Sequence, residues 1–430
     1  MSSIRQKLTA SYYTLGCKLN FSETSAIGRA LRGCGIATAS EGTAPDIIVV
    51  NTCSVTETAD KKGRSLIRHL SRQYPDASIV VTGCYAQLKP DEAAALPGVA
   101  LVLGSGEKLR AAEFVDRWMD DHNPTVAVTP SRQIREFTPS CERGDRTRWF
   151  LKIQDGCDYY CTYCTIPYAR GRSRSGQIPD LVRRVEDAAE NGAKEIVITG
   201  VNIGEFGNDN GQSFFDLIKE LDHIEGVDRY RISSIEPNLI TDEIIDWVAG
   251  SRAFMPHFHI PLQAGSDLVL KRMNRRYGTE LFRERIEHIK RVMPHAFIGV
   301  DVIAGARGET PEEWHKAKDF IESLPITRLH VFPYSERPGT AALLLPDPVE
   351  PRVRHERVAE LIDISDRKLK GFLRNEIGRE TTVLWEHTEH HGMIQGFTDN
   401  YIRVQAPFDA SQPNTVTPIT LSTDNIIPNQ

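Results

Sequence analysis

Apolar residues in the first 120 positions gather in short runs without alternation. Three runs stand out at positions 11–17, 45–53 and 77–84, with the sequences SYYTLGC, PDIIVVNTC and ASIVVTGC. Unbroken β-branched runs of this kind are typical of parallel strands that are buried on both faces. Helix-like stretches separate the runs, so residues 1–121 predict a βαβαβ unit with a doubly wound parallel sheet.

A second α/β unit follows a stretch richer in charge and turn formers, residues 122–145, which we expect to be a linker. Over residues 146–375 six strand-like runs alternate with helical stretches: WFLKIQDG, KEIVITGVN, RYRISSIEP, PHFHIPLQ, AFIGVDVIAG and TRLHVFPYS. This alternation predicts a (β/α)6 partial TIM barrel, in which the site lies at the C-terminal ends of the strands.

The texture changes again over residues 376–430. The runs TTVLWE, HGMIQGFTDN and NYIRVQAP are short and alternating, with Gly- and Asn-rich turns between them. Such runs favour a small antiparallel β-barrel. The chain as a whole is therefore expected to be α/β.

Composition places the chain in the ordinary globular class, with 40% hydrophobic, 26% charged and 8% aromatic residues. It has no run of about 20 apolar residues and no apolar leader, so we expect a cytoplasmic protein without a membrane partner. The net charge of −6 gives no general attraction to nucleic acid. RNA binding would need local basic patches such as ARGRSRS and LKRMNRRY, for which a solvated surface is the ordinary alternative.

Eight cysteines in a reducing compartment point to metal ligands, catalytic thiols or core residues before disulfides. Cys157, Cys161 and Cys164 lie within eight residues. Structural zinc takes four ligands, usually in pairs, whereas an iron–sulfur cubane held by three thiolates leaves one iron open for a small molecule. Zinc binding and incidental cysteines are the alternatives.

Three further cysteines, Cys17, Cys53 and Cys84, each follow one of the first three strand-like runs. The carboxyl ends of parallel strands meet at one edge of a sheet, so these cysteines can converge as a ligand set. The alternative is that each is a common buried residue. The two remaining cysteines are interpreted as a packing residue, Cys34, and an exposed linker thiol, Cys141.

The CxxxCxxC spacing after the first barrel strand resembles the radical S-adenosylmethionine (SAM) superfamily. Along the whole chain, the segments that resemble methylthiotransferases are LGCKLNFSE, NTCSVT, TGCYAQ, GCDYYCTYCTIPYARGRSRS, RISSIEP, IPLQAGSDLVLKRMNRRY and HVFPYSERPGT. The segment GFTDNYIRV resembles the TRAM domain of that family. GCKLNFSE and TYCTIPYARGRSRS are most similar to the branch that acts on N6-threonylcarbamoyladenosine next to the anticodon of tRNA.

This resemblance implies an enzyme that methylthiolates C2 of the modified adenine. Cys157, Cys161 and Cys164 would hold a 4Fe–4S cluster that binds SAM and yields a 5′-deoxyadenosyl radical. Cys17, Cys53 and Cys84 would hold a second 4Fe–4S cluster, whose open iron carries the sulfur to be inserted, and a second SAM would donate the methyl group. The implied partners are the tRNA anticodon stem-loop and an electron donor such as flavodoxin or ferredoxin, and we expect a monomer.

The resemblance also suggests contact residues. For SAM they are Tyr163, Gly200, Asn202, Ser234, Glu236 and Gln263, with turn residues or helix caps as the alternative reading. For RNA the candidates come from the two basic runs and from aromatic residues that could stack on bases: Arg170, Arg172, Arg174, Arg275, Arg276, Phe397 and Tyr401, with a solvated surface or the barrel core as the alternative. The family motif Gly-Phe-Pro-Gly-Glu-Thr reads GARGET here, with Ala306 and Arg307 in place of the aromatic and the proline. This departure would loosen a loop of the SAM pocket, and Arg307 would either add charge toward RNA or point into water.

Other functions fit parts of the pattern. The same chemistry could act on an aspartate of a ribosomal protein or on isopentenyladenosine in tRNA. From different classes, a two-cluster electron carrier, an iron–sulfur scaffold or a zinc-dependent RNA-binding module would also use these cysteines.

Overall fold

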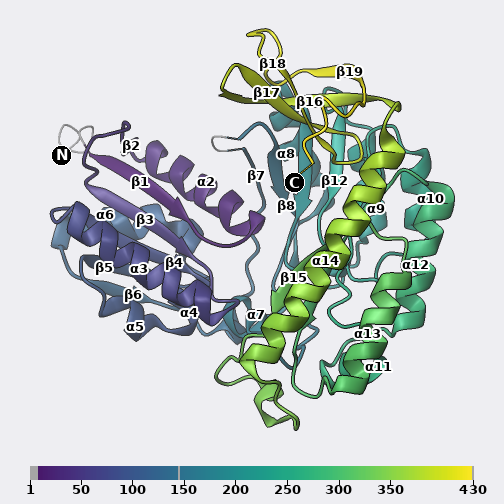
Figure 1. Ribbon diagram of the computed structural model, residues 1–430. Helices are drawn as coiled ribbons and strands as arrows, with labels where there is room; N and C mark the ends of the chain where they lie inside the picture. The colour runs from purple at the N-terminus through teal and green to yellow at the C-terminus, as the bar shows by residue number, and fades with distance from the viewer. Residues whose placement is uncertain (1–7, 144–145, 429–430) are drawn as a thin grey trace.

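The N-terminal part of the chain folds around a six-stranded parallel sheet with the order β2-β1-β3-β4-β5-β6 (Figure 1). The structure is a computed structural model that describes residues 8–143 and 146–428. The strands are β1 (Thr9–Thr14), β2 (Ala37–Thr38), β3 (Ile47–Thr52), β4 (Ser78–Gly83), β5 (Val99–Leu103) and β6 (Thr125–Ala127). The helices are α2 (Lys18–Gly33), α3 (Glu57–Gln73), α4 (Cys84–Leu88), α5 (Pro90–Ala94) and α6 (Ala111–Asp121).

Both faces of this sheet are covered by helices. Ile48 and Val50 of β3 pack with α3, whereas Ile47 and Val49 pack with α2 and α6. Successive strand residues point to opposite faces, so a strand covered on both faces must be apolar at every position. The predicted doubly wound sheet is confirmed.

Sequence analysis did not predict β2, β5 or β6. β6 lies inside the stretch expected to be a linker, residues 122–145, and pairs with β5. Another part of that stretch forms β7 (Ser140–Glu142), while residues 144–145 lie outside the described part of the chain. A strand of three residues is too short to show a pattern in the sequence, and only its pairing defines it.

Six parallel strands form the predicted partial barrel. They are β8 (Trp149–Lys152), β11 (Glu195–Thr199), β12 (Arg229–Ile232), β13 (His257–His259), β14 (Phe297–Ala304) and β15 (Arg328–Pro333). β8, β11 and β12 are in one sheet and β13 to β15 are in another, and the parallel bridges Tyr230–Phe254 and Ser234–His259 join the two. β7 adds an antiparallel edge strand to β8.

Helices follow these strands in the chain, and most of them cover the outside of the barrel, whereas the short α7 packs against α4 of the N-terminal part (Figure 1). They are α7 (Ile166–Arg170), α8 (Ile178–Glu190), α9 (Phe214–Asp222), α10 (Asp242–Gly250), α11 (Asp267–Arg272), α12 (Thr279–Val292), α13 (Pro311–Ser323) and the long α14 (Pro351–Glu376). The first barrel turn contains two short strands, β9 (Gln154–Asp155) and β10 (Arg174–Ser175), which pair with each other.

The C-terminal segment is a four-stranded antiparallel sheet that curls into a half-barrel. Its order is β18-β17-β16-β19, formed by β16 (Glu380–His390), β17 (Met393–Thr398), β18 (Arg403–Pro407) and β19 (Val416–Thr420). Arg229 and Arg231, both on β12, donate hydrogen bonds to backbone carbonyls of this sheet. The half-barrel is thereby attached to the N-terminal ends of the barrel strands, where Figure 1 shows it above the barrel.

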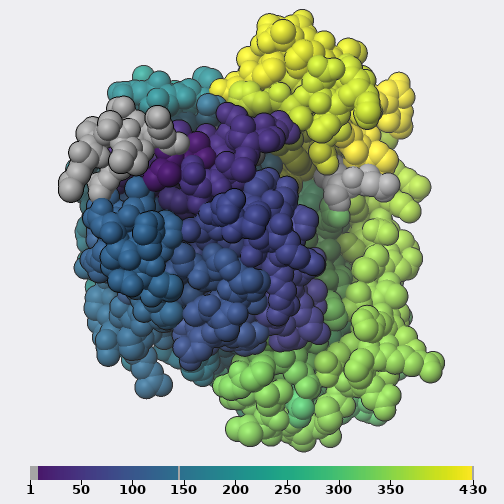
Figure 2. Space-filling view, turned by 90° about the vertical axis from the view of Figure 1, so that its left-hand side faces the viewer, coloured from purple at the N-terminus to yellow at the C-terminus, as the bar shows by residue number. Residues whose placement is uncertain are grey.

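The three parts pack side by side. In Figure 2 the purple and blue residues of the N-terminal sheet lie directly below the yellow half-barrel and beside the green residues that lead into α14. Within the described residues, no helix combines the length and apolar character required to cross a membrane.

The two leftover cysteines exchange the roles that sequence analysis gave them. Cys34, at the end of α2, is exposed, whereas Cys141 is buried in β7 against the barrel core. The linker-like composition around Cys141 did not reveal that β7 pairs with β8.

Candidate active site

The loop that carries three cysteines begins where β9 ends and is held by the backbone on two sides. The amide of Cys157 donates to the carbonyl of Gly171 at 3.1 Å, and the amide of Thr162 donates to the carbonyl of Met273 at 3.1 Å. Gly156 has a φ of +75°, and a Cβ there would overlap the carbonyl oxygen of Arg172. Only glycine fits this approach, so it positions the loop that follows.

Cys157, Cys161 and Cys164 line one cavity of about 340 Å³. The same cavity is lined by five of the six residues suggested for SAM, namely Tyr163, Asn202, Ser234, Glu236 and Gln263. They come from the cysteine loop and from the ends of β11, β12 and β13, so the carboxyl ends of the strands bring them together, as expected for this architecture. Gly200 is not part of the lining; it packs against Gln154, and the Gln154 Oε1 accepts hydrogen bonds from the next two amides.

Each of the three sulfurs accepts at least one N–H hydrogen bond. The Tyr159 amide donates to Cys157 Sγ at 3.4 Å and the Ile166 amide donates to Cys164 Sγ at 3.4 Å. Burial raises the pKa of all three thiols, that of Cys164 to about 12, so an incoming metal must displace protons. N–H donors to sulfur favour the thiolate and tune a bound cluster.

Cys161 has a charged neighbour, Arg275. The Arg275 Nη1 donates to Cys161 Sγ at 3.0 Å, and its Nη2 pairs with the Glu236 carboxylate. With 3% of its side chain exposed, Arg275 lines the cavity and is not part of the exposed basic patch that the run LKRMNRRY suggested. The neighbouring Arg276 is exposed and lies over the Tyr159 ring at 4.0 Å.

Sequence analysis overlooked Asp301, which lines the cavity from β14. Its carboxylate is hydrogen-bonded to His259 Nε2 at 2.7 Å. The sequence could have revealed Asp301, because it is the one acidic residue in the apolar run AFIGVDVIAG. A carboxylate in a buried strand normally has a polar partner or a functional role. Gln263, which lines the same wall, has a φ of +66°. Non-glycine residues in the left-handed region are strained and gather at functional sites.

The loop between β3 and α3 closes one side of the cavity through Val55 and Thr56. Arg337, from the loop after β15, locks this side in place by donating to Asp60 at 2.8 Å and to Ser54 at 2.9 Å. The cavity is therefore completed by distant segments of the chain: Val55 lies about 100 positions before Cys157 and about 280 before Ser335, which both line it.

Cys17, Cys53 and Cys84 lie together at the carboxyl ends of β1, β3 and β4. A Cβ on Gly16 would lie 2.7 Å from Cys53 Cβ, so the chain before Cys17 passes directly over Cys53. Burial, together with the nearby Cys84 and Cys17, raises the pKa of Cys53 to about 11. Cys17 is exposed, Cys53 is half-buried and Cys84 is buried.

No group of three or more Cys, His, Asp or Glu side chains in the described ranges is arranged to hold a single metal ion. In an iron–sulfur cubane each thiolate binds a different iron, so the three sulfurs need not meet at one point. A mononuclear zinc would require sulfurs about 3.8 Å apart, given a Zn–S bond of about 2.3 Å. A cubane therefore does not require the convergence of sulfurs that a single metal ion does.

A buried network of charges adjoins Cys84. Arg170 donates to Glu23 at 3.1 Å, to Asp155 at 2.9 Å and to Asn20 at 2.6 Å. Burial alone would raise the pKa of Glu23, but Arg170 and two buried lysines outweigh it and hold that pKa well below its usual range. The lysines are Lys108 and Lys152, which pair with Glu23 at 2.6 and 2.9 Å.

The three arginines that follow the cysteine loop differ in burial. Arg170 and Arg174 are buried and bonded within the protein, so neither is available to an RNA phosphate, contrary to the expectation from sequence. Their partners lie far away in the chain, which is why the local run ARGRSRS reads as a surface patch. Arg172 is exposed.

The two aromatic residues suggested for RNA binding, Phe397 and Tyr401, also make contacts within the protein. Tyr401 stacks on Phe397 with ring centroids 4.7 Å apart, and its hydroxyl accepts a hydrogen bond from Arg148. The Arg148 guanidinium lies 4.6 Å from the Phe397 ring centroid. These contacts match the alternative reading, in which both rings pack at the base of the half-barrel.

Ala306 and Arg307, the two residues that depart from the family motif in GARGET, make contacts within the protein. Ala306 is buried in a small cluster with Tyr334. Arg307 pairs with Glu336 at 3.0 Å and donates to the carbonyls of Leu343 and Leu345. This loop is tied to the segment after β15, and Arg307 points neither into the cysteine cavity nor freely into water.

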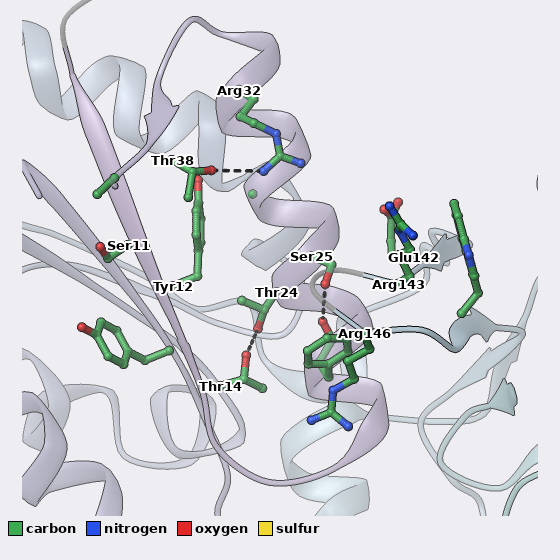
Figure 3. A pocket seen from close by; sticks show the side chains of 15 residues that line it. Ser11, Tyr12, Thr14, Thr24, Ser25, Arg32, Thr38, Glu142, Arg143 and Arg146 are labelled. Atoms are coloured by element: carbon green, nitrogen blue, oxygen red, sulfur yellow. Dashed lines mark hydrogen bonds between the residues drawn. The ribbon is translucent and has the colours of Figure 1, made fainter. Parts of the chain in front are cut away.

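A larger groove, of about 850 Å³, lies elsewhere, between β1, α2 and residues 142–143 and 146–149 (Figure 3). Arg32 donates to Thr38 there, and the Arg146 guanidinium lies 4.4 Å from the Phe21 ring centroid. None of the residues that line this groove lines the cysteine cavity. We place the active site in the smaller cavity, because it contains the cysteines.

Comparison with known proteins bears on both cysteine sets. Residues 9–104 match the family described as uncharacterized protein family UPF0004, and residues 151–321 match the radical SAM superfamily. A threonylcarbamoyladenosine tRNA methylthiotransferase MtaB of Bacillus subtilis (strain 168) is 40% identical over 92% of this chain and 90% of its own length. The chain belongs to the radical SAM methylthiotransferase family.

Other relatives support the same family at lower identity. The MtaB of Thermotoga maritima is 35% identical over 92% of this chain and 90% of its own, and a tRNA-2-methylthio-N(6)-dimethylallyladenosine synthase of Pelotomaculum thermopropionicum is 31% identical over 95% and 93%. Among solved structures, the radical SAM methyltransferase TsrM of Kitasatospora setae shares the fold, with a TM-score of 0.56 over 76% of this chain and 72% of that one, at 15% identity.

Membership of the radical SAM superfamily implies a 4Fe–4S cluster and SAM. One buried and two half-buried cysteines with N–H donors to their sulfurs, in a cavity of about 340 Å³ with convergent polar side chains, fit that requirement.

Proposed function

We propose that this chain methylthiolates C2 of N6-threonylcarbamoyladenosine next to the anticodon of tRNA. The observation that carries the proposal is the cavity at the strand ends, which joins the three cysteines of the loop to five polar candidates for SAM. The name of the relative that is 40% identical supports the choice of substrate.

In this proposal Cys157, Cys161 and Cys164 hold a 4Fe–4S cluster. Bound there with SAM, it supplies the one-electron reductive cleavage of SAM. Arg275 keeps the Glu236 carboxylate oriented at the cavity wall through their ion pair. Gln154 holds the backbone after Gly200, so that Asn202 faces the cavity.

We further propose that Cys17, Cys53 and Cys84 hold a second 4Fe–4S cluster, which carries the sulfur to be inserted. The thiolates and core of such a cluster bear net negative charge. Arg170 and Lys108 lie close enough to Cys84 to lower its pKa against the larger effect of burial. Their positive charge would offset that of a buried cluster, and this supports the assignment.

The division of the chain belongs to the same proposal: an N-terminal methylthiotransferase unit at residues 1–121, a connecting segment at 122–145, a radical SAM barrel at 146–375 and a TRAM-like unit at 376–430. The partners are the tRNA anticodon stem-loop and a one-electron donor. We propose that the chain acts in the cytoplasm.

An anaerobic assay tests the function. Reconstituted protein, SAM, dithionite and tRNA that lacks the methylthio group are incubated, and the digested nucleosides are analysed by mass spectrometry. We expect a methylthio mass gain on threonylcarbamoyladenosine and not on isopentenyladenosine. A gain on isopentenyladenosine alone would move the chain to the branch of the dimethylallyladenosine synthases, and 5′-deoxyadenosine without any tRNA product would favour a protein substrate.

Cysteine variants separate the two sites. Cys161→Ala should abolish 5′-deoxyadenosine formation, whereas Cys84→Ala should retain it and lose sulfur insertion. Cys34→Ala is the matched control, because Cys34 is exposed at the end of α2 and belongs to neither set. Sulfur insertion by Cys84→Ala at the wild-type rate would refute the second cluster.

A further inference from the structure

The outer face of the cysteine loop presents aromatic side chains to solvent. Tyr160 lies between Cys157 and Cys161 and is 40% exposed, and Tyr168 is 46% exposed. Their rings meet edge to face with centroids 6.2 Å apart. Tyr160 has a φ of +49°, so the loop holds this residue in a strained conformation. Tyr168 is on the adjacent helix α7, whereas Tyr160 is an exposed residue at a strained position of the site loop and calls for a functional explanation.

Tyr160 borders a groove of about 790 Å³, whose lining is basic. Arg132, Arg135 and Arg172 are exposed around it. Arg174 also lines it, but its guanidinium is committed to the backbone carbonyls of Arg170, Arg172 and Glu136. Asp209 is the only acidic side chain among the described residues of the lining, and it accepts a hydrogen bond from the Ser175 amide. The Arg135 Nη1 donates to the carbonyl of Arg132 at 2.6 Å, so the groove offers three exposed arginine side chains, one of them bonded to the backbone, against one engaged carboxylate.

The cysteine loop is the wall between this groove and the active-site cavity. Cys157, Cys161 and Cys164 line the cavity, whereas Tyr160 lines the groove, and no described residue lines both. Arg172 directly follows Gly171, whose carbonyl accepts the hydrogen bond from the Cys157 amide. A molecule seated in the groove would be separated from the cluster ligands by the thickness of one loop.

We propose that this groove, lined by Arg132, Arg135, Arg172 and Tyr160, docks the electron donor: a small acidic redox protein with a flavin or an iron–sulfur centre. The inference rests on the proposed function, which needs one electron from outside for each SAM cleaved. In the docked complex one electron leaves the donor, which is oxidised by one electron, and reduces the cluster by one; no bond is made or broken in this step.

Three features favour a protein donor over RNA. Tyrosine and arginine are the residues enriched at the energetic centres of protein interfaces. Complementary charge brings transient redox partners together over small interfaces and makes their association depend on salt. The substrate base must reach the cavity on the inner side of the loop, whereas an electron needs only a short path through the wall.

The test compares two sources of electrons for the same holoenzyme. Formation of 5′-deoxyadenosine is measured with reduced flavodoxin and, separately, with dithionite, which needs no docking surface. In the triple variant R132Q/R135Q/R172Q the flavodoxin-supported rate at limiting flavodoxin should fall by roughly tenfold or more at low salt and lose most of its salt dependence. The dithionite-supported rate and the affinity for tRNA should not change.

The matched control is R68Q/R291Q/R352Q, which removes the same charge from exposed positions on α3, α12 and α14. It should behave like the wild type with both reductants. The single substitution Arg172→Glu serves as a second variant, and calorimetric titration with oxidised flavodoxin measures docking without turnover. We expect weaker binding for Arg172→Glu than for the wild type.

Each other outcome overturns the inference. If tRNA affinity falls while the flavodoxin-supported rate is normal, the groove is an RNA surface. If the dithionite-supported rate falls equally, these arginines support the cluster and not a partner. If the wild type accepts electrons from flavodoxin and the triple variant does so equally well, the donor docks elsewhere. A wild type inactive with dithionite would instead refute the proposed function itself, and this inference with it.

Discussion

Arg275 provides a quantitative test of the site, because it places a positive charge against a cluster ligand. Its Nη1 lies 3.0 Å from Cys161 Sγ, and its side chain is almost fully buried. The substitution Arg275→Met keeps much of the side-chain volume and removes the charge. Because a nearby positive charge favours the reduced cluster, the variant should have a lower reduction potential than the wild type.

The size of the effect follows from Coulomb's law. A metal–thiolate bond of about 2.3 Å beyond the sulfur puts the added electron on the order of 6 Å from the guanidinium. At an effective dielectric constant of about 20, two unit charges at that distance interact by about 3 kcal/mol. For a one-electron couple, where about 1.4 kcal/mol corresponds to 59 mV, this is on the order of 100 mV. Proton uptake by the unpaired Glu236 reduces the shift, so we expect a fall of roughly 50 to 100 mV.

The assay is an anaerobic redox titration followed by electron paramagnetic resonance. It is carried out with the Cys84→Ala substitution in the background, so that the proposed second cluster does not contribute. Arg276→Met is the matched control, because Arg276 is adjacent in sequence but exposed, and solvent screens its charge. A potential for Arg275→Met that is equal to that of Arg276→Met, or higher than the wild-type value, would refute the reasoning.

Two further predictions concern the other parts of the fold. Gly83 has a φ of +94° and a ψ of −164°, and a Cβ there would overlap the carbonyl oxygen of Thr52. The substitution Gly83→Ala should therefore distort the turn into α4 and lower the free energy of unfolding by about 2 to 3 kcal/mol. Iron analysis should then show about half the wild-type iron per chain, while Gly42→Ala, at a φ of +79° with no neighbouring atoms, keeps it all. Burial raises the pKa of Asp399, but hydrogen bonds and charge from Arg379 outweigh it and lower that pKa from 3.8 to about 2. The ionised Asp399 carboxylate therefore contributes about 2.5 kcal/mol to the free energy of unfolding. This contribution is present above about pH 4 and is lost as the pH falls toward 2. The difference in thermal stability between the wild type and Asp399→Asn should shrink over that range.

Either prediction can fail clearly. Full iron content in Gly83→Ala would show that the turn tolerates a side chain or that the adjacent cysteine does not bind a cluster. A difference between wild type and Asp399→Asn that stays constant from pH 6 to pH 3 would show that the folded-state pKa of this carboxyl is not depressed.

Features set by neighbours along the chain could be predicted from sequence. The spacing of Cys157, Cys161 and Cys164 places three thiols on one short loop whatever surrounds it. The unbroken apolar run that forms β3 predicted a strand covered on both faces, because a strand between two helical layers can carry no polar position without a partner. The parallel order of the strands then implied that Cys17 and its two counterparts would meet at one edge.

The burial and the partners of charged side chains were decided only by the tertiary structure. Arg170 and Arg172 are alike in sequence, yet one is buried against Glu23, 147 positions away, and the other faces solvent beside the cysteine loop. Arg275 likewise acquires its role from Cys161, 114 positions away. The energy of a charge depends on the dielectric and the opposite charges around it, which distant segments supply. The sequence by itself therefore determined the ligand loop and the layers of the fold, whereas long-range packing decided which arginines serve the site and which remain free for a partner.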